Sequence, residues 1–267
     1  SPSFLLGVMV WHVKQVAKAT INDPVLIEGL PGMGNVGKIA VDFVIDALKA
    51  KKIYELFSYD LPHCVFINKE NIMELPTINV YHKQCGKRSL LFLAGDIQPI
   101  SESSCYEFCN TILDTFHPHH LAEIITLGGI ALPRVPKEPK VYCTGNSKSY
   151  IRRFPVELVN RNIYGVVGPI IGVSGLLPGL AGKRNIPAAA LLAETYGHPN
   201  YLGVRGARSL LQVLSKQLNL RIDLRELDAE VENVEEELVT KSQQLDQLTK
   251  MLKRKASTAL PKTDYIG

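Results

Sequence analysis

Hydrophobic positions in the first 218 residues follow two spacings: short continuous apolar runs, and stripes in which apolar residues recur three and four positions apart. The runs predict buried strands, and the stripes predict helices with one face on a core. The two alternate along the chain, which is typical of an α/β layered domain with a largely parallel or mixed sheet flanked by helices. The expected strands are residues 24–27, 53–58, 64–68, 78–82, 89–94, 124–127, 140–143, 166–173 and 188–192.

Helices are expected at 36–47, 101–116, 147–154, 174–181 and 205–218. The second of these is the clearest, because Ser101 has the side chain of an N-cap and Glu102 follows where the helix dipole favours a negative charge. Gly86 lies between two expected strands and predicts a hairpin turn. The apolar face of the second helix consists of Cys105, Phe108, Cys109, Ile112, Leu113 and Phe116.

The pattern changes after Leu220, where leucine and valine recur at alternating steps of four and three residues. This heptad seam, sustained for about four repeats, predicts a coiled-coil-like helix that packs copies of the chain together. We therefore expect an α/β core domain at 1–219, a helical heptad segment at 220–255 and a flexible tail at 256–267. The predicted oligomerisation residues are Leu224, Leu227, Val231, Val234, Leu238, Leu245, Leu248 and Leu252.

Composition adds little to this picture. The 267 residues are 46% hydrophobic and 21% charged, with a net charge of +4, as in an ordinary soluble protein. Five cysteines, an odd number, predict a reducing cytoplasm, and no secretory signal is evident. Residues 162–182 imitate a membrane span, but Pro169 and Pro178 would interrupt such a helix. A buried strand, a turn and a short helix are the favoured interpretation, and no membrane partner is expected.

The loop from Leu30 to Lys38 matches two nucleotide-binding patterns in part. Gly32, Gly34 and Gly37 have the spacing of a dinucleotide-binding fold, while Gly32, Gly37 and Lys38 have that of a P-loop. The P-loop next needs a Ser or Thr hydroxyl for Mg²⁺, and Ile39 stands there.

Partner acids for such a loop are poorly placed. A dinucleotide site needs an acidic residue about twenty positions on, and Glu55 lies inside an expected strand instead of at its end. Asp96 ends an apolar strand, as the acid of a P-loop protein does. A nucleotide- or small-ligand-binding enzyme that uses residues 32–38 is therefore the alternative function. The favoured interpretation is a structural strand-to-helix turn.

Other candidate chemistry is weak. Cys105 and Cys109, with His117, His119 and His120, have unspecific zinc spacing, and the apolar face of a core helix already explains both cysteines. Basic residues between 140 and 161 are scattered, so no nucleic-acid partner is expected. The sequence predicts no catalytic residue, no metal and no cofactor.

Three stretches, in order, resemble the proteasome assembly chaperone family, most closely its archaeal members. They are residues 28–37 (EGLPGMGNVG), residues 172–177 (GVSGLL) and residues 186–197 (IPAAALLAETYG). The resemblance covers roughly residues 20–240 and implies a non-enzymatic α/β protein. Such a protein assembles with itself or a paralogue and binds the α-type subunits of the proteasome core particle.

Some members of that family end in a hydrophobic-Tyr-any tripeptide that inserts between neighbouring α subunits. In this sequence the corresponding residues are Tyr265, Ile266 and Gly267, which the resemblance implies to be the partner-binding residues. Tyr265 is third from the last residue instead of second, and Asp264 before it is not hydrophobic. The register of the tail therefore departs from the family pattern.

Overall fold

The computed structural model describes residues 11–225 and 227–229. The chain divides into two compact units, Ser1–Asp223 and Leu224–Gly267. In the described part of the second unit, the amide of Asp228 donates to the carbonyl of Leu224. Most of the heptad seam and the whole tail lie outside the described residues, so those predictions and the proposed domain boundaries stay predictions.

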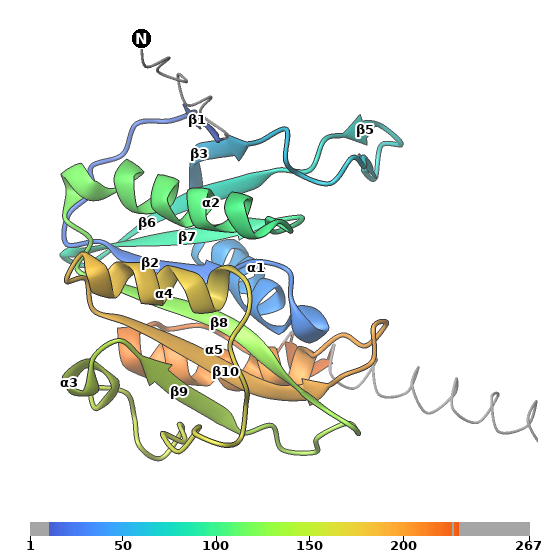
Figure 1. The fold of residues 1–267 in the computed structure, drawn as a ribbon, viewed down its shortest axis with the longest axis vertical. Coiled ribbons are helices and arrows are strands. Elements are labelled where there is room, and N and C mark those ends of the chain that lie inside the picture. The colour runs from blue at the N-terminus through green and yellow to red at the C-terminus, as the bar shows by residue number, and fades with distance from the viewer. Residues whose placement is uncertain (1–10, 226, 230–267) are drawn as a thin grey trace, which may run out of the picture. The chain divides into compact units, whose positions relative to one another are not determined.

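The first unit is built on a mixed eight-stranded sheet (Figure 1). Its four central strands β7, β2, β8 and β10 run parallel, and the strands added on both sides pair antiparallel. The predicted α/β class is confirmed. In spatial order the strands are β1 (His12–Gln15), β3 (Lys51–Phe57), β6 (Ile78–Cys85), β7 (Arg88–Gly95), β2 (Val25–Gly29), β8 (Glu123–Leu132), β10 (Ala188–Tyr196) and β9 (Val141–Gly145).

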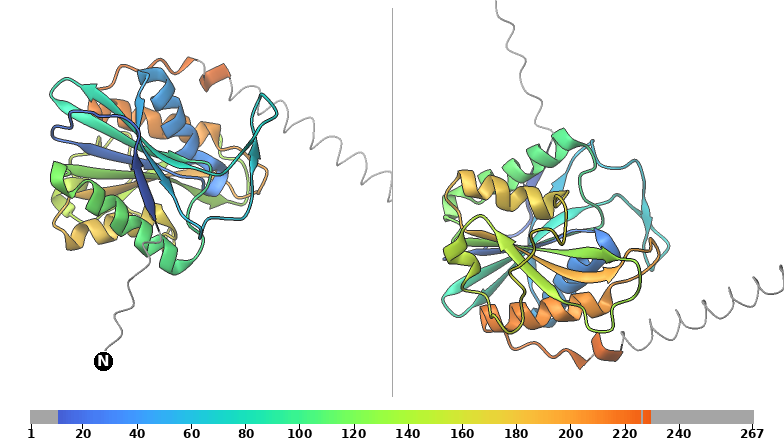
Figure 2. Two further views of the ribbon diagram at one scale, coloured as in Figure 1. Left: turned by 90° about the horizontal axis from the view of Figure 1, so that it is seen from above. Right: turned by 60° about the horizontal axis from the view of Figure 1, so that its bottom comes forward.

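Helices cover both faces of this sheet. Helices α2 (Glu102–Thr115) and α4 (Val173–Lys183) contact each other on one face, and α1 (Val36–Leu48) and α5 (Val204–Leu218) do so on the other. Figure 2 shows the two helical layers with the sheet between them. The short helix α3 (Lys148–Ile151) lies beside β9.

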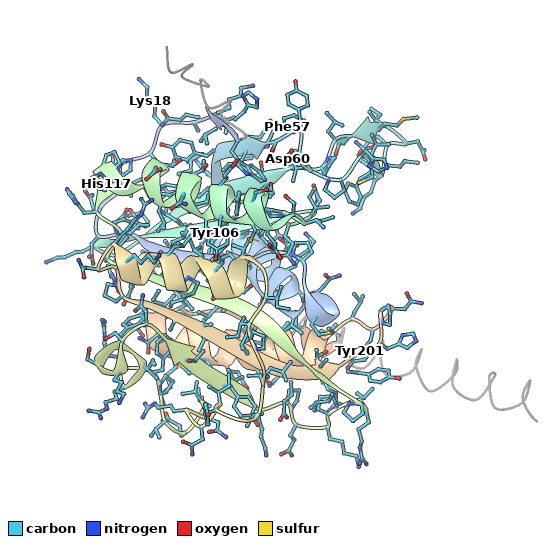
Figure 3. All side chains as sticks on the ribbon, in the orientation of Figure 1. Lys18, Phe57, Asp60, Tyr106, His117 and Tyr201 are labelled. Atoms are coloured by element: carbon cyan, nitrogen blue, oxygen red, sulfur yellow. The ribbon has the colours of Figure 1, made fainter. Side chains whose placement is uncertain are left out.

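Two apolar layers follow from the side-chain alternation along the central strands. In β2 every residue is buried, and Leu26 belongs to the cluster under α2 and α4, so Val25 and Ile27 face the opposite layer. Side chains fill the space between sheet and helices (Figure 3). Trp11 joins the first layer, with its ring centroid 4.6 Å from that of Phe108.

Two predicted strands differ from the structure. No strand includes 166–172, because Gly165 and Gly172 have positive φ angles of 79° and 85°, which interrupt an extended backbone; α4 begins at Val173. The strand at 64–68 shortens to β4 (Phe66–Ile67), which pairs with β5 (Met73–Glu74) outside the main sheet. The expected helices all form, and that at 147–154 shortens to α3.

The hairpin around Gly86 is confirmed, since β6 and β7 pair antiparallel across it and Gly86 has a φ of 60°. Within the described ranges, no helix is long and apolar enough to cross a membrane. The segment at 162–182 instead forms a surface loop and α4.

The predicted N-cap of α2 is confirmed and makes a testable contribution. The hydroxyl of Ser101 accepts a hydrogen bond from the amide of Ser104 at 3.2 Å. We expect Ser101→Ala to lower the free energy of unfolding by about 1 kcal/mol, because that amide loses its partner. Glu107→Ala is the control, since Glu107 is an exposed residue of the same helix beyond the cap. Equal unfolding midpoints of both variants in urea would contradict the assignment.

Candidate functional site at the carboxyl ends of the parallel strands

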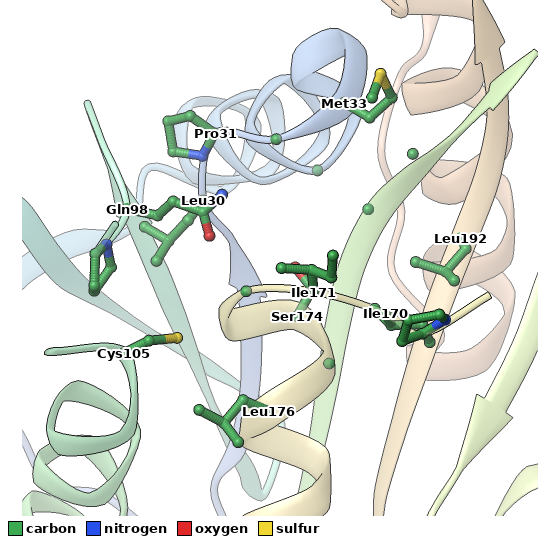
Figure 4. Close-up of a pocket in the computed structure, with 18 of the residues that line it drawn as sticks. Leu30, Pro31, Met33, Gln98, Cys105, Ile170, Ile171, Ser174, Leu176 and Leu192 are labelled. Carbon is green, nitrogen blue, oxygen red and sulfur yellow. The ribbon is translucent and has the colours of Figure 1, made fainter. Parts of the chain in front are cut away.

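A cavity of about 950 Å³ opens at the carboxyl ends of the parallel strands. Strand β2 pairs with β8 only as far as Glu28 opposite Thr126, so β8 continues past it and the sheet opens there. The chain leaves β2 toward α1 on one face and β7 toward α2 on the other, a switch point at which α/β proteins commonly bind ligands. Side chains at the rim and walls include Leu30, Met33, Gln98, Cys105, Ile170, Ile171, Leu176 and Leu192 (Figure 4).

The predicted glycine loop forms one wall, and its glycines serve close packing. A Cβ at Gly37 would collide with the carbonyl of Leu127 in β8, so only glycine lets α1 start this close to the sheet. Gly34 has a φ of 60°, and its carbonyl accepts a hydrogen bond from the amide of Gly203 at 2.7 Å. The loop is thus tied to the start of α5 by the chain itself.

Lys38, the residue on which the P-loop interpretation depended, points away from a phosphate site. Its Nζ lies 2.8 Å from Oδ2 of Asp42 on the next turn and donates to the carbonyl of Gly95 at 3.1 Å. Among the described residues that line the cavity there is no Lys, Arg or His. A positive charge for a bound phosphate would therefore have to come from Lys38, whose ammonium group already contacts Asp42 and Gly95.

The two acids considered for a nucleotide site each have partners of their own. Strands β6 and β7 separate β3, which carries Glu55, from β2. Glu55 pairs with Lys52 on its own strand. Asp96 accepts hydrogen bonds from the amide and hydroxyl of Thr77. Asp96 follows β7, the strand beside β2, and Lys38 of the loop donates to the carbonyl of the preceding Gly95, so only Glu55 is remote from the loop.

Glu28 is the group that sequence reasoning missed. It is completely buried below the cavity. Its Oε1 accepts from the amide of Leu30 at 2.9 Å, and its Oε2 accepts from the hydroxyl of Ser174 at 3.0 Å. Burial raises the pKa of Glu28 to about 7, although both hydrogen bonds act to lower it. The signal in the sequence was an acid inside an apolar run, which costs free energy unless it is hydrogen-bonded.

A carboxyl that titrates near neutral pH can act as a general acid or base. Glu28, however, exposes no surface to a reactant, and its two partners belong to the end of β2 and the first turn of α4. Thr126 strengthens the same junction, because its hydroxyl donates to the carbonyl of Ser174 at 2.6 Å. The arrangement holds the two segments together under the cavity.

The cysteine and histidine residues considered for zinc do not form a cluster. Cys105 and Cys109 lie on the buried face of α2, where the predicted stripe places them. His117 and His119 belong to a separate turn after that helix, and Figure 3 shows His117 beyond the C-terminal end of α2. In the chain as described, no group of three or more potential metal ligands is found.

The fold and the site together define a class: an α/β protein with helices on both faces of its sheet and a strand-end cavity walled by a glycine turn. Within that class, a family model described as the PAC2 family matches residues 26–240. The chain belongs to this family.

Three proteins illustrate what this chain is similar to. PbaB of Pyrococcus furiosus, whose crystal structure is described as that of an archaeal proteasome activator, is 31% identical to this chain. The two structures match with a TM-score of 0.81, over 88% of this chain and 100% of PbaB. PbaA of the same organism, described as an archaeal homolog of proteasome-assembly chaperone, is 25% identical, with a TM-score of 0.67 over 89% and 100%. An uncharacterized Methanocaldococcus jannaschii protein, MJ1210, is 27% identical over 99% of both chains. The resemblance to archaeal assembly chaperone homologues is confirmed.

Proposed function

We propose that this chain is a non-enzymatic proteasome assembly chaperone or proteasome-interacting scaffold. In this proposal it acts in the cytoplasm as a homo-oligomer, alone or with a paralogue, and binds α-type subunits of the core particle. The observation that carries the proposal is the 31% identity to PbaB, which extends over 88% of this chain and the whole of that one.

The geometry of the glycine loop supports the non-enzymatic part of the proposal. Gly37 is required by its contact with β8, and Lys38 pairs with Asp42. These contacts give the motif a structural role, so nucleotide binding is not needed to account for it.

The partner-binding residues in this proposal are Tyr265, Ile266 and Gly267. An aromatic side chain that fills a pocket is a common centre of binding energy, and several copies held together would multiply a weak contact through avidity. The heptad seam from Leu224 to Leu252 is the proposed means of holding copies together.

Binding to purified α-type subunits, measured by biolayer interferometry, tests the proposed contact. We expect Tyr265→Ala in the full chain to weaken the interaction at least about tenfold, as the loss of an aromatic anchor does. Thr263→Ala is the control and is expected to bind like the unaltered chain. Equal affinities for the two variants would contradict the assignment of the tail, whereas no binding by the unaltered chain would contradict the function itself.

A further inference from the structure

A small hairpin stands apart from the main sheet. Residues 62–76, which we call the arm, connect β3 to β6 and contain β4 and β5. These two strands form a separate antiparallel sheet, with Phe66 opposite Glu74 and Ile67 opposite Met73. Figures 1 and 2 show the arm projecting from the edge of the first unit.

Local hydrogen bonds hold the arm in shape. At its tip, Oδ1 of Asn68 accepts from the amides of Glu70 and Ile72 at 3.0 and 2.9 Å. The side-chain amide of Asn68 donates to Glu74 at 2.7 Å, and Asn71 takes the positive φ of 61° that the turn requires. The hairpin is therefore preorganised, which lowers the entropy cost of binding through it.

One face of the arm is entirely apolar. Because Ile67 lies opposite Met73, alternation puts Val65 and Leu75 on the same face. Their exposed fractions are 49% for Val65, 69% for Ile67, 73% for Met73 and 59% for Leu75. An antiparallel sheet normally packs its apolar face on a core, and across the described residues neither hydrophobic cluster includes these four.

We propose that a second copy of this chain covers this face, the two arms packing face to face across a two-fold axis. Burying an aliphatic side chain removes on the order of 100 Å² from water. These four side chains, each about half exposed or more, therefore present on the order of 250 Å². One partner in a standard interface contributes roughly 800 Å², of which about 60% is apolar, so the arm supplies about half of the apolar part.

The charge pattern favours an identical partner. The apolar face itself carries no charge, so two copies can approach without repulsion. At the tip, Lys69 and Glu70 are adjacent and opposite in sign, a pattern that complements itself when a two-fold axis brings two tips together. A partner of strongly positive or negative surface would instead favour a tip of one sign.

This inference rests on the self-association in the proposed function, not on proteasome binding. It locates a contact in the first unit, whereas the predicted heptad seam lies in the second. The two contacts can therefore be separated by substitution in the full-length chain.

Sedimentation of the full chain across a concentration series tests the inference. The double variant Ile67→Glu/Met73→Lys puts opposite charges on a cross-strand pair, which keeps the hairpin favourable while removing the apolar face. We expect it to sediment as a smaller species than the unaltered chain, with a dissociation constant at least about tenfold higher. The control is Val156→Glu/Tyr164→Lys, since both residues are exposed apolar positions outside the arm.

Each outcome decides one point. A control that retains the unaltered mass, with an arm variant that loses it and keeps its circular dichroism spectrum and unfolding midpoint, supports the arm contact. An arm variant with unchanged mass overturns the inference but leaves self-association in place; loss of mass in Leu245→Asp/Leu248→Asp alone would then assign it to the seam. A monomeric unaltered chain overturns both.

Discussion

Gly37→Ala is expected to lower the free energy of unfolding by about 3 kcal/mol, the upper end of the usual range for overpacking, because here the backbone must give way. The reason is the first turn of α1, which passes so close to β8 that a methyl group at Gly37 would collide with the carbonyl of Leu127. The atoms in the way belong to the backbone of β8 and not to a flexible side chain that could move aside, so the helix itself would have to shift. The effect is on the fold and needs no ligand.

Gly32→Ala is the matched control, because both positions belong to the same motif. A Cβ at Gly32 meets no atom within 4 Å, and its φ of −159° is extended backbone. We expect a change of less than about 1 kcal/mol there. Urea unfolding of the two variants measures the difference. Equal stabilities would contradict the structural account of the loop and return attention to its nucleotide-binding interpretation.

Glu28→Gln is expected to remove a pH dependence of stability worth up to about 3 kcal/mol. The pKa of Glu28 is raised by burial from 4.5 to about 7. Between these values the folded protein holds a proton that the unfolded chain has released. The contribution of protonated Glu28 to stability is therefore complete below pH 4.5. It falls as the pH rises and is lost above pH 7.

The glutamine can keep the same partners. Its carbonyl oxygen accepts from Leu30, and its amide can donate to Ser174, whose hydroxyl lies 3.3 Å from the carbonyl of Leu127. Unfolding free energies of the unaltered chain and the variant, measured from pH 5 to pH 8, test this. The unaltered chain should lose stability relative to the variant as the pH rises, whereas Glu102→Gln, at an exposed acid of the cavity rim, should follow the unaltered chain. A constant difference would show that Glu28 does not titrate in this range.

The local sequence pattern was enough to predict elements that are stabilised by residues close to one another in the sequence. Helix α2 has both a cap at Ser101 and an uninterrupted apolar face, and the structure contains both. The sequence also favoured a structural role for the glycine loop, because Ile39 and Glu55 do not fit the nucleotide-binding patterns. The close packing of Gly37 against β8 agrees with that role. The same patterns gave the α/β class.

Tertiary partners explain what the patterns missed. The role of Glu28 depends on Ser174, 146 residues away, and no local signal connects the two. Strand β1 was missed because its mostly polar, exposed residues pair only with the edge of β3. The strand expected at 166–173 does not form, because Gly165 and Gly172 adopt positive φ angles that an apolar pattern does not reveal.

The most direct test of the proposed function is the mass of what this chain forms with purified proteasome α-type subunits. Native mass spectrometry of the full chain mixed with those subunits at micromolar concentration would give it in one measurement. The account predicts a discrete complex that contains several copies of this chain together with α subunits. Separate masses for the two proteins, with no shared complex at any mixing ratio, would contradict it.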